Sequence, residues 1–175
     1  MKKLFLLLFI FFYSQNTFSQ NVSNKLIQEY EDTLKIIAEQ IMFAKKENDR
    51  INANNGFIPI LKEVLSFDKS YKYPFDSLQT LSILSPEDNS FRIFNWILRK
   101  DNGTYDYFCI IHYNNKKKKK YEIIELIDKS NNIRNESFAD LDSKNWYGAL
   151  YYKIIYLKKS GRKYYTLLGW DGNDG

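Results

Sequence analysis

Residues 147–170 read YGALYYKIIYLKKSGRKYYTLLGW, and this stretch decides the fold. It holds two runs of aromatic, aliphatic and β-branched residues, 147–157 and 164–170, on either side of Ser160-Gly161. Such a pattern predicts two antiparallel strands joined by a two-residue turn. The turn would set three pairs opposite one another: Leu157 with Tyr164, Tyr156 with Tyr165, and Tyr151 with Trp170. Because both faces of 151–157 are largely apolar, we expect an interior strand that is covered on both sides, one cover being the N-terminal helix.

The same period of two continues upstream. Four further strands are predicted at 78–84, 91–98, 105–113 and 121–128. The segments between them are short and rich in Asn, Asp, Gly, Pro and Lys, as in consecutive hairpins. No long helical pattern separates these strands, so the sequence predicts an antiparallel meander of six strands.

The N-terminal third has helical spacing instead. Apolar residues recur at Leu26, Tyr30, Leu34, Ile37 and Ile41, which predicts an amphipathic helix over 23–48 that begins at Ser23 or Asn24. The Asn-rich residues 52–56 should end it. A short second helix is expected over 58–67, with Pro59 in its first turn. The predicted fold class is therefore α+β, with helices over 23–67 and the meander over 78–170.

The first 19 residues have the layout of a signal peptide, with Lys2 and Lys3 before the apolar run LFLLLFIFFY. We expect cleavage near Gln20, a single domain over 20–175, and a periplasmic or extracellular location without a transmembrane segment. Loss of the two leader lysines lowers the net charge from +5 to +3. Cys109 is the only cysteine, so no internal disulfide can form.

Several chemistries find no support in the sequence. Cys109 and His112 would point to opposite faces of a strand, so they do not predict a zinc site; we expect a buried thiol and a partly exposed imidazole. The terminal run Asp171-Gly172-Asn173-Asp174-Gly175 lacks the closing carboxylate of a calcium loop and predicts a turn. No nucleophile or phosphate-binding motif occurs. No catalytic residue, cofactor or metal is therefore predicted.

Two groups of residues are candidates for contacts. Consecutive lysines predict a solvated hairpin tip, and the alternative is contact with anionic envelope polymers or lipid headgroups, which suits the run better than nucleic acid: Lys116, Lys117, Lys118, Lys119 and Lys120. Aromatic residues near turns are candidates for ligand contact: Trp146, Tyr147 and Trp170. The alternative for these three is a place in the core.

Two segments carry a resemblance. Residues 73–96, YPFDSLQTLSILSPEDNSFRIFNW, and 146–174, WYGALYYKIIYLKKSGRKYYTLLGWDGND, resemble a group of uncharacterised secreted proteins of Bacteroidota. In that group the turn after the last strand leads into further strands. The resemblance therefore implies that this chain is an N-terminal fragment or a shortened member, and it implies no reaction.

Two function classes follow. The first is a non-enzymatic exported module that binds in the envelope or forms homo-oligomers through an edge strand. The alternative is a hydrolase of envelope or dietary polymers that uses paired carboxylates. Its candidate acids are Asp106, Glu122, Glu125, Asp140 and Asp142. Carboxylates that line a concave pocket would favour the enzyme, whereas an exposed sheet would favour binding.

Overall fold

The computed structural model describes residues 23–135 and 138–173, so the predicted leader lies outside the described residues. The helices are α1 (Asn24–Phe43), α2 (Glu47–Leu65) and the short 3-10 helices η1 (Asp68–Lys72) and η2 (Ser130–Asn132). The strands are β1 (Ser82–Leu84), β2 (Phe91–Arg99), β3 (Tyr105–Asn115), β4 (Lys120–Leu126), β5 (Leu150–Lys159) and β6 (Arg162–Trp170). The α+β class and the antiparallel meander are confirmed.

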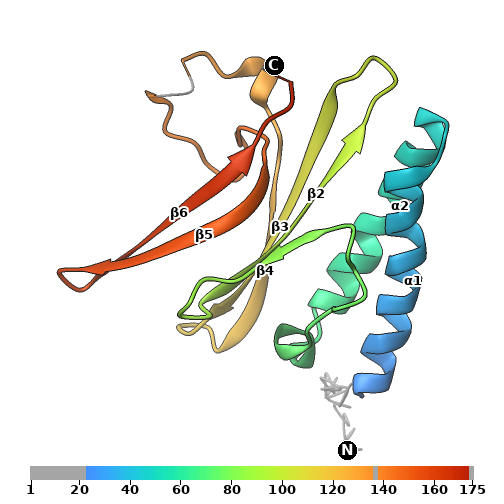
Figure 1. The fold of residues 1–175 in the computed structure, drawn as a ribbon. Coiled ribbons are helices and arrows are strands. Elements are labelled where there is room, and N and C mark those ends of the chain that lie inside the picture. Colours follow the sequence, from blue (N-terminus) through green and yellow to red (C-terminus); the bar gives the residue numbers. More distant parts are fainter. Residues whose placement is uncertain (1–22, 136–137, 174–175) are drawn as a thin grey trace, which may run out of the picture.

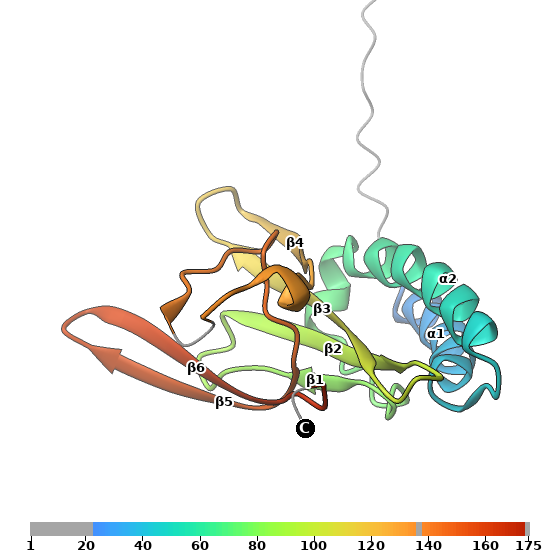
Figure 2. The same cartoon turned by 90° about the horizontal axis from the view of Figure 1, so that it is seen from above.

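The strands form two sheets, not one. One sheet has four antiparallel strands in the order β1-β2-β3-β4, and the other is the two-stranded β5-β6 hairpin. The helices cover one face of the larger sheet, and the hairpin lies on its other side and projects away from the helices (Figures 1 and 2). Alternation along β2 divides its side chains between two cores, because Phe94 and Trp96 face the helices whereas Ile93 faces the hairpin.

The break between the two helices differs from the prediction. α1 begins at the predicted N-cap, where the Ser23 hydroxyl accepts a hydrogen bond from Leu26 N, but it ends at Phe43. The cause is Arg50, which is fully buried. Its guanidinium donates to the carbonyl oxygens of Ala44 and Lys45, and to Asp101 at the far end of β2. The chain therefore turns at 44–46, before the Asn-rich residues.

The Asn-rich segment lies inside α2, which corrects the prediction of a helix end at 52–56. Asn54 is buried because its side-chain oxygen accepts a hydrogen bond of 2.8 Å from the indole of Trp96. Pro59 stands well inside the same helix. Its missing N–H costs about 3 kcal/mol. That cost is offset by the fully buried side chains of the helix: Phe57, Leu61, Val64 and Leu65.

The β5-β6 turn is as predicted near its tip. Leu157 pairs with Tyr164 and Tyr156 with Tyr165, and both turn residues, Ser160 and Gly161, have positive φ, as a type I′ turn requires. At the base the register shifts at Tyr152, so that Trp170 pairs with Leu150 instead of Tyr151.

The prediction that β5 is an interior strand is wrong. Among the described residues β5 pairs only with β6, and neither α1 nor α2 covers the hairpin (Figure 1). Asn95 of β2 joins the hairpin to the larger sheet. It accepts from Tyr151 N at 2.5 Å and donates to the oxygens of Ala149 and Phe108. Because Asn95 is fully buried, this amide is a main connection between the two sheets.

Candidate functional site

One face of the β5-β6 hairpin is apolar and open to solvent. The register puts Ile155 opposite Thr166 and Leu157 opposite Tyr164 on this face. The exposed fractions are 44% for Ile155, 55% for Leu157 and 48% for Tyr164. We call Lys153, Ile155, Leu157, Tyr164, Thr166 and Leu168 the outer face. An exposed group of large apolar side chains in a folded domain is typical of a contact surface.

The opposite face of the hairpin holds it in place. Ile154 and Leu167 pack into the second core, and the Tyr165 ring meets Phe91 edge-on at 4.9 Å. The Tyr165 hydroxyl also bonds to Asp88 in the turn between β1 and β2, at 3.0 Å. The outer face is therefore presented by a supported hairpin, since its inner face is packed.

The hairpin carries only positive charge. Within 150–170 there are five basic residues and no acidic ones: Lys153, Lys158, Lys159, Arg162 and Lys163. Lys163 makes a 2.5 Å ion pair with Asp88. Burial by itself raises the pKa of Asp88, but hydrogen bonds from Lys163, Ser90 and Tyr165 lower that pKa to about 2. The other four basic residues make no ion pair within the part of the chain that the structure describes.

The lysine run forms the β3-β4 turn, as the sequence predicts. Residues 116–119 are the turn, and all five lysines are exposed. Lys118 and Lys120 pair with Glu122 at 2.9 and 3.3 Å. Hydrogen bonds from Tyr113, Asn115 and Lys118 lower the pKa of the Glu122 carboxyl. One carboxylate therefore serves two lysines, and three remain without a partner among the described residues.

The two basic turns lie on the same side of the molecule, away from the helices (Figures 1 and 2). Two contacts join them through the β1-β2 turn. Asp88 binds Lys163 of the hairpin, and the Asn89 carbonyl accepts from the Tyr71 hydroxyl, whose ring stacks on Tyr121 at 4.4 Å. We call residues 116–120 together with 158–163 the basic end.

The three aromatic candidates are separated by the fold. Trp146 is buried, 6% exposed, and its indole donates to the Tyr151 hydroxyl at 2.7 Å, so it belongs to the core. Tyr147 is half-buried. Trp170 is 44% exposed and packs edge-on against Tyr105 at 5.2 Å. Only Trp170 of the three is an exposed aromatic, and it lies at the base of the hairpin.

The terminal turn is clamped onto β3. The Asp171 carboxylate accepts from the Tyr107 hydroxyl, which in turn accepts from Gly172 N at 2.7 Å. Asn173 bonds both to the N–H and to the C=O of Tyr105. Gly172 has no room for a side chain, because a Cβ would lie 2.3 Å from the Trp170 ring. This segment therefore acts as a structural clasp.

The five candidate carboxylates of the hydrolase alternative lie mostly at separate places in the fold. Asp106 and Glu125 line one cleft, whereas Glu122 lies beside the lysine turn and Asp142 binds the backbone of Lys144 and Asn145. Asp140 is exposed, in the segment between η2 and β5. Within the cleft, Asp106 is paired with Lys100 and Glu125 with Lys62, both at 2.5 Å. Asp106 and Glu125 thus each already have an ammonium partner.

The prediction that His112 is partly exposed is wrong. It is fully buried, and neither ring nitrogen has a hydrogen-bond partner. The rings of Tyr71 and Tyr121 meet it edge-on, and burial together with nearby Arg92 lowers its pKa to about 4. Cys109 is buried in the other core, as predicted, and burial raises the pKa of its thiol to about 12. The sequence carries no local signal that η1 covers His112.

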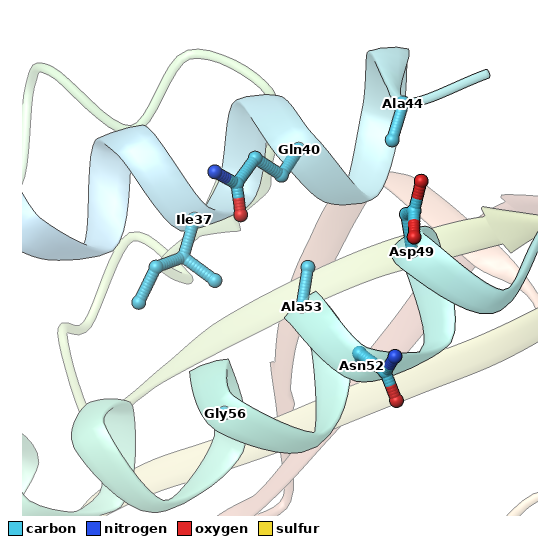
Figure 3. Close-up of a pocket in the computed structure, with 7 residues that line it drawn as sticks. All are labelled: Ile37, Gln40, Ala44, Asp49, Asn52, Ala53 and Gly56. Atoms are coloured by element: carbon cyan, nitrogen blue, oxygen red, sulfur yellow. The ribbon is translucent and has the colours of Figure 1, made fainter. Parts of the chain in front are cut away.

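A groove of about 600 Å³ runs between α1 and α2 (Figure 3). Its lining is mostly small or polar: Ile37, Gln40, Ala44, Asp49, Asn52, Ala53 and Gly56. It contains no buried unpartnered polar side chain, because those of the described residues lie on Ser70, Ser77 and His112.

In the described parts of the chain, no helix is long and apolar enough to span a membrane. Nor do the described His, Cys, Asp and Glu residues form a group of three that suits a metal ion. Comparisons of the chain with protein-family models, with curated protein sequences and with solved structures found no match.

Proposed function

We propose that this chain is a non-enzymatic, exported binding module that attaches to anionic lipid surfaces of the cell envelope. The basic end makes the electrostatic contact, and the outer face of the β5-β6 hairpin makes the apolar contact. The observation that carries the proposal is the combination on one hairpin of exposed Ile155, Leu157 and Tyr164 with a net positive charge and no carboxylate. Export follows from the predicted leader.

The arrangement on the outer face suits an interface between water and lipid. Lys159 and Arg162 stand opposite each other at the tip, Lys153 stands near the base, and the apolar side chains lie between them. Tyrosine and tryptophan favour the headgroup region, because each has an apolar ring and a polar group. Lysine and arginine side chains can extend their charge towards phosphates while their stems stay with the apolar layer.

The unpaired positive charge of the basic end is large enough to support binding to an anionic membrane. Six basic residues of the basic end have no ion-pair partner among the described residues: Lys116, Lys117, Lys119, Lys158, Lys159 and Arg162. Each contributes about 1 kcal/mol near an anionic membrane. The sum of about 6 kcal/mol corresponds to dissociation constants on the order of tens of micromolar before any apolar contribution.

Charge also favours an anionic lipid surface over a second copy of the chain as the partner of the hairpin. Both edges of the hairpin are free towards its tip, so strand addition is sterically open. However, two hairpins that each carry five basic residues and no acidic ones would repel each other. Lysines near an edge are also a common protection against such pairing.

The test is co-sedimentation with vesicles of phosphatidylcholine alone or with about one third phosphatidylglycerol, as a composition that gives a clear negative surface potential. We expect binding to the anionic vesicles only, and a steep loss as salt rises. The variant Lys159→Glu/Arg162→Glu should bind at least tenfold more weakly. The matched control is Lys25→Glu/Lys35→Glu, which makes the same charge change at exposed positions of α1 and should lose much less.

Three results would contradict the proposal. They are equal binding to both kinds of vesicle, equal losses in the two charge variants, and binding of a single-stranded oligonucleotide as tight as that of anionic vesicles. The last result would identify the basic end as a nucleic-acid surface.

A further inference from the structure

Among the described residues two arginines are buried, and they differ in their counter-charge. Arg50 is fully buried and pairs with Asp101 at 2.6 Å. Arg92, on β2, is 8% exposed, and no carboxylate of the described residues forms an ion pair with it. Burial lowers the pKa of Arg92, and Tyr71 and Asp76 oppose this shift only in part. Since a buried charge without an opposite charge is costly, the positive charge of Arg92 lacks compensation.

Backbone carbonyls hold one end of the Arg92 guanidinium. Nη1 donates to three carbonyl oxygens of the segment 70–73 at 2.6–3.2 Å, and Nη2 donates to Pro74 O at 3.2 Å. The ring centroids of Phe75 and Phe94 lie 5.5 and 5.0 Å from its Cζ. The guanidinium is therefore fixed in place by η1 and by the residues that follow it.

The other edge of this guanidinium has no partner among the described residues. In any arginine, Nε and Nη2 each direct one N–H to the same side. The carbonyls occupy Nη1 and one hydrogen of Nη2, whereas nothing bonds to Nε. Nor is Nε among the buried polar atoms that lack a partner, so it retains contact with solvent. Two parallel donors therefore remain, in the geometry that binds both oxygens of a carboxylate.

A pocket of about 640 Å³ gives access to Arg92. Its volume is in the range of about 300–1,000 Å³ that is usual for ligand sites. The other lining residues are half-buried or exposed, so Arg92 is the most buried part of the pocket. The described residues contribute no acidic side chain to this lining, which combines aromatic rings, amides and a second positive charge: Tyr71, Tyr121, Asn89, Asn114 and Lys72.

His112 is a second buried polar group beside Arg92. The two residues stand opposite each other in β3 and β2, so their side chains share one face of the sheet. Both ring nitrogens of His112 lack a partner, and its ring meets Tyr71 and Tyr121 of the pocket wall. Burial and the charge of Arg92 lower the pKa of His112. A negative charge bound to Arg92 would therefore change the environment of the imidazole.

We propose that this pocket binds a small organic carboxylate, whose two oxygens accept hydrogen bonds from Nε and Nη2 of Arg92. The apolar part of the ligand lies against the rings of Tyr71 and Tyr121. A carboxylate fits better than a phosphate, because a single buried guanidinium is balanced by a single negative charge and Lys72 is exposed. The pocket shares no residue with the basic end or with the outer face, so this site is separate from the lipid contact.

The test is NMR titration of the ¹⁵N-labelled chain with benzoate, with benzamide as its neutral counterpart and phenyl phosphate as its more highly charged one. Benzoate should shift the amide signals of Asn89 and Asn114 saturably. His112 is the only histidine, and its imidazole signals should shift with the same dissociation constant. Benzamide should bind at least tenfold more weakly. Benzamide or phenyl phosphate that binds as tightly as benzoate, or shifts confined to residues 116–120, would overturn the proposal.

Three variants sharpen the test. Ser85→Trp puts a large ring into the pocket wall and should abolish the binding of benzoate, whereas Gln79→Trp, at an exposed position outside this wall, should not. Arg92→Lys keeps the charge but loses the two parallel N–H groups, so the folded variant should bind benzoate at least tenfold more weakly. Equal binding by Ser85→Trp and Gln79→Trp would refute the site, whether or not Arg92→Lys folds. The two Trp variants leave the basic end intact, so their vesicle binding should stay the same.

Discussion

His112 should make the protein sensitive to mild acid. The imidazole is fully buried and neutral in the folded state, with its pKa lowered to about 4. In the unfolded chain the same group titrates near its ordinary value of about 6.5. Below that value the unfolded state binds a proton that the folded state excludes. The titration of His112 therefore leaves the free energy of unfolding unchanged above about pH 6.5. It lowers this free energy as the pH drops from there towards 4.

The size of the effect follows from the shift. One pKa unit corresponds to about 1.36 kcal/mol, so a drop from pH 7 to pH 4.5 should cost about 2–3 kcal/mol of unfolding free energy. The variant His112→Phe keeps an aromatic ring between Tyr71 and Tyr121 and removes both unpartnered nitrogens. It should be more stable than the wild type by about 1–2 kcal/mol at pH 7, since an unsatisfied buried polar group is costly.

The assay is urea unfolding followed by tryptophan fluorescence at pH 7, 6, 5 and 4.5. His112 is the only histidine, so the difference between wild type and variant isolates its titration from that of the carboxylates. We expect the difference in unfolding free energy to grow by about 2–3 kcal/mol between pH 7 and pH 4.5. A constant difference across this range would refute the reasoning, because it would mean that His112 takes up its proton equally in both states.

Three further predictions concern the fold. Asn95→Ala should lower the free energy of unfolding by about 2–4 kcal/mol, because it leaves Tyr151 N without a partner, and hydrogen exchange should rise first in β5 and β6. Gly148→Ala should destabilise the fold by about 1–3 kcal/mol, since its Cβ would lie 2.4 Å from the Asp128 carboxylate. Gly56→Ala in α2 should stabilise it by about 0.5–1 kcal/mol, because its Cβ meets nothing within 4 Å. Thermal unfolding measures both effects. Asp88→Asn should cost about 1–2 kcal/mol at neutral pH, and this cost should vanish as the pH falls from 4 through about 2, where the wild-type carboxylate also becomes neutral.

Local chemistry made the hairpin tip predictable. Ser160 and Gly161 adopt the positive φ values that a two-residue turn needs, and the turn sets the pairs next to it. The register error arises farther away, at Tyr152. There the backbone of the preceding Tyr151 is bound by Asn95 and Ser82 of the larger sheet. No pattern within residues 147–170 reports these partners.

The other errors have the same cause. The helix break depends on Arg50 reaching Arg99 and Asp101, and the burial of His112 depends on Tyr71 lying across it. Both contacts join segments about forty or more residues apart, so periodicity cannot reveal them. Only part of the basic end is predictable from the sequence. The lysine run is a local pattern, but its proximity to the β5-β6 tip comes from the fold.

The central claim is that the outer face meets lipid. Cys109 is buried, so a cysteine introduced at an exposed position can be labelled selectively with a nitroxide. Leu157→Cys on the outer face and Ile36→Cys on α1 are exposed by 55% and 61%, which makes them a matched pair. On addition of anionic vesicles, the label at 157 should gain collisions with oxygen and lose collisions with a water-soluble nickel complex, while the label at 36 should keep its aqueous values. Vesicle-bound protein in which the label at 157 stays in water, or in which the label at 36 enters the lipid, would contradict the account.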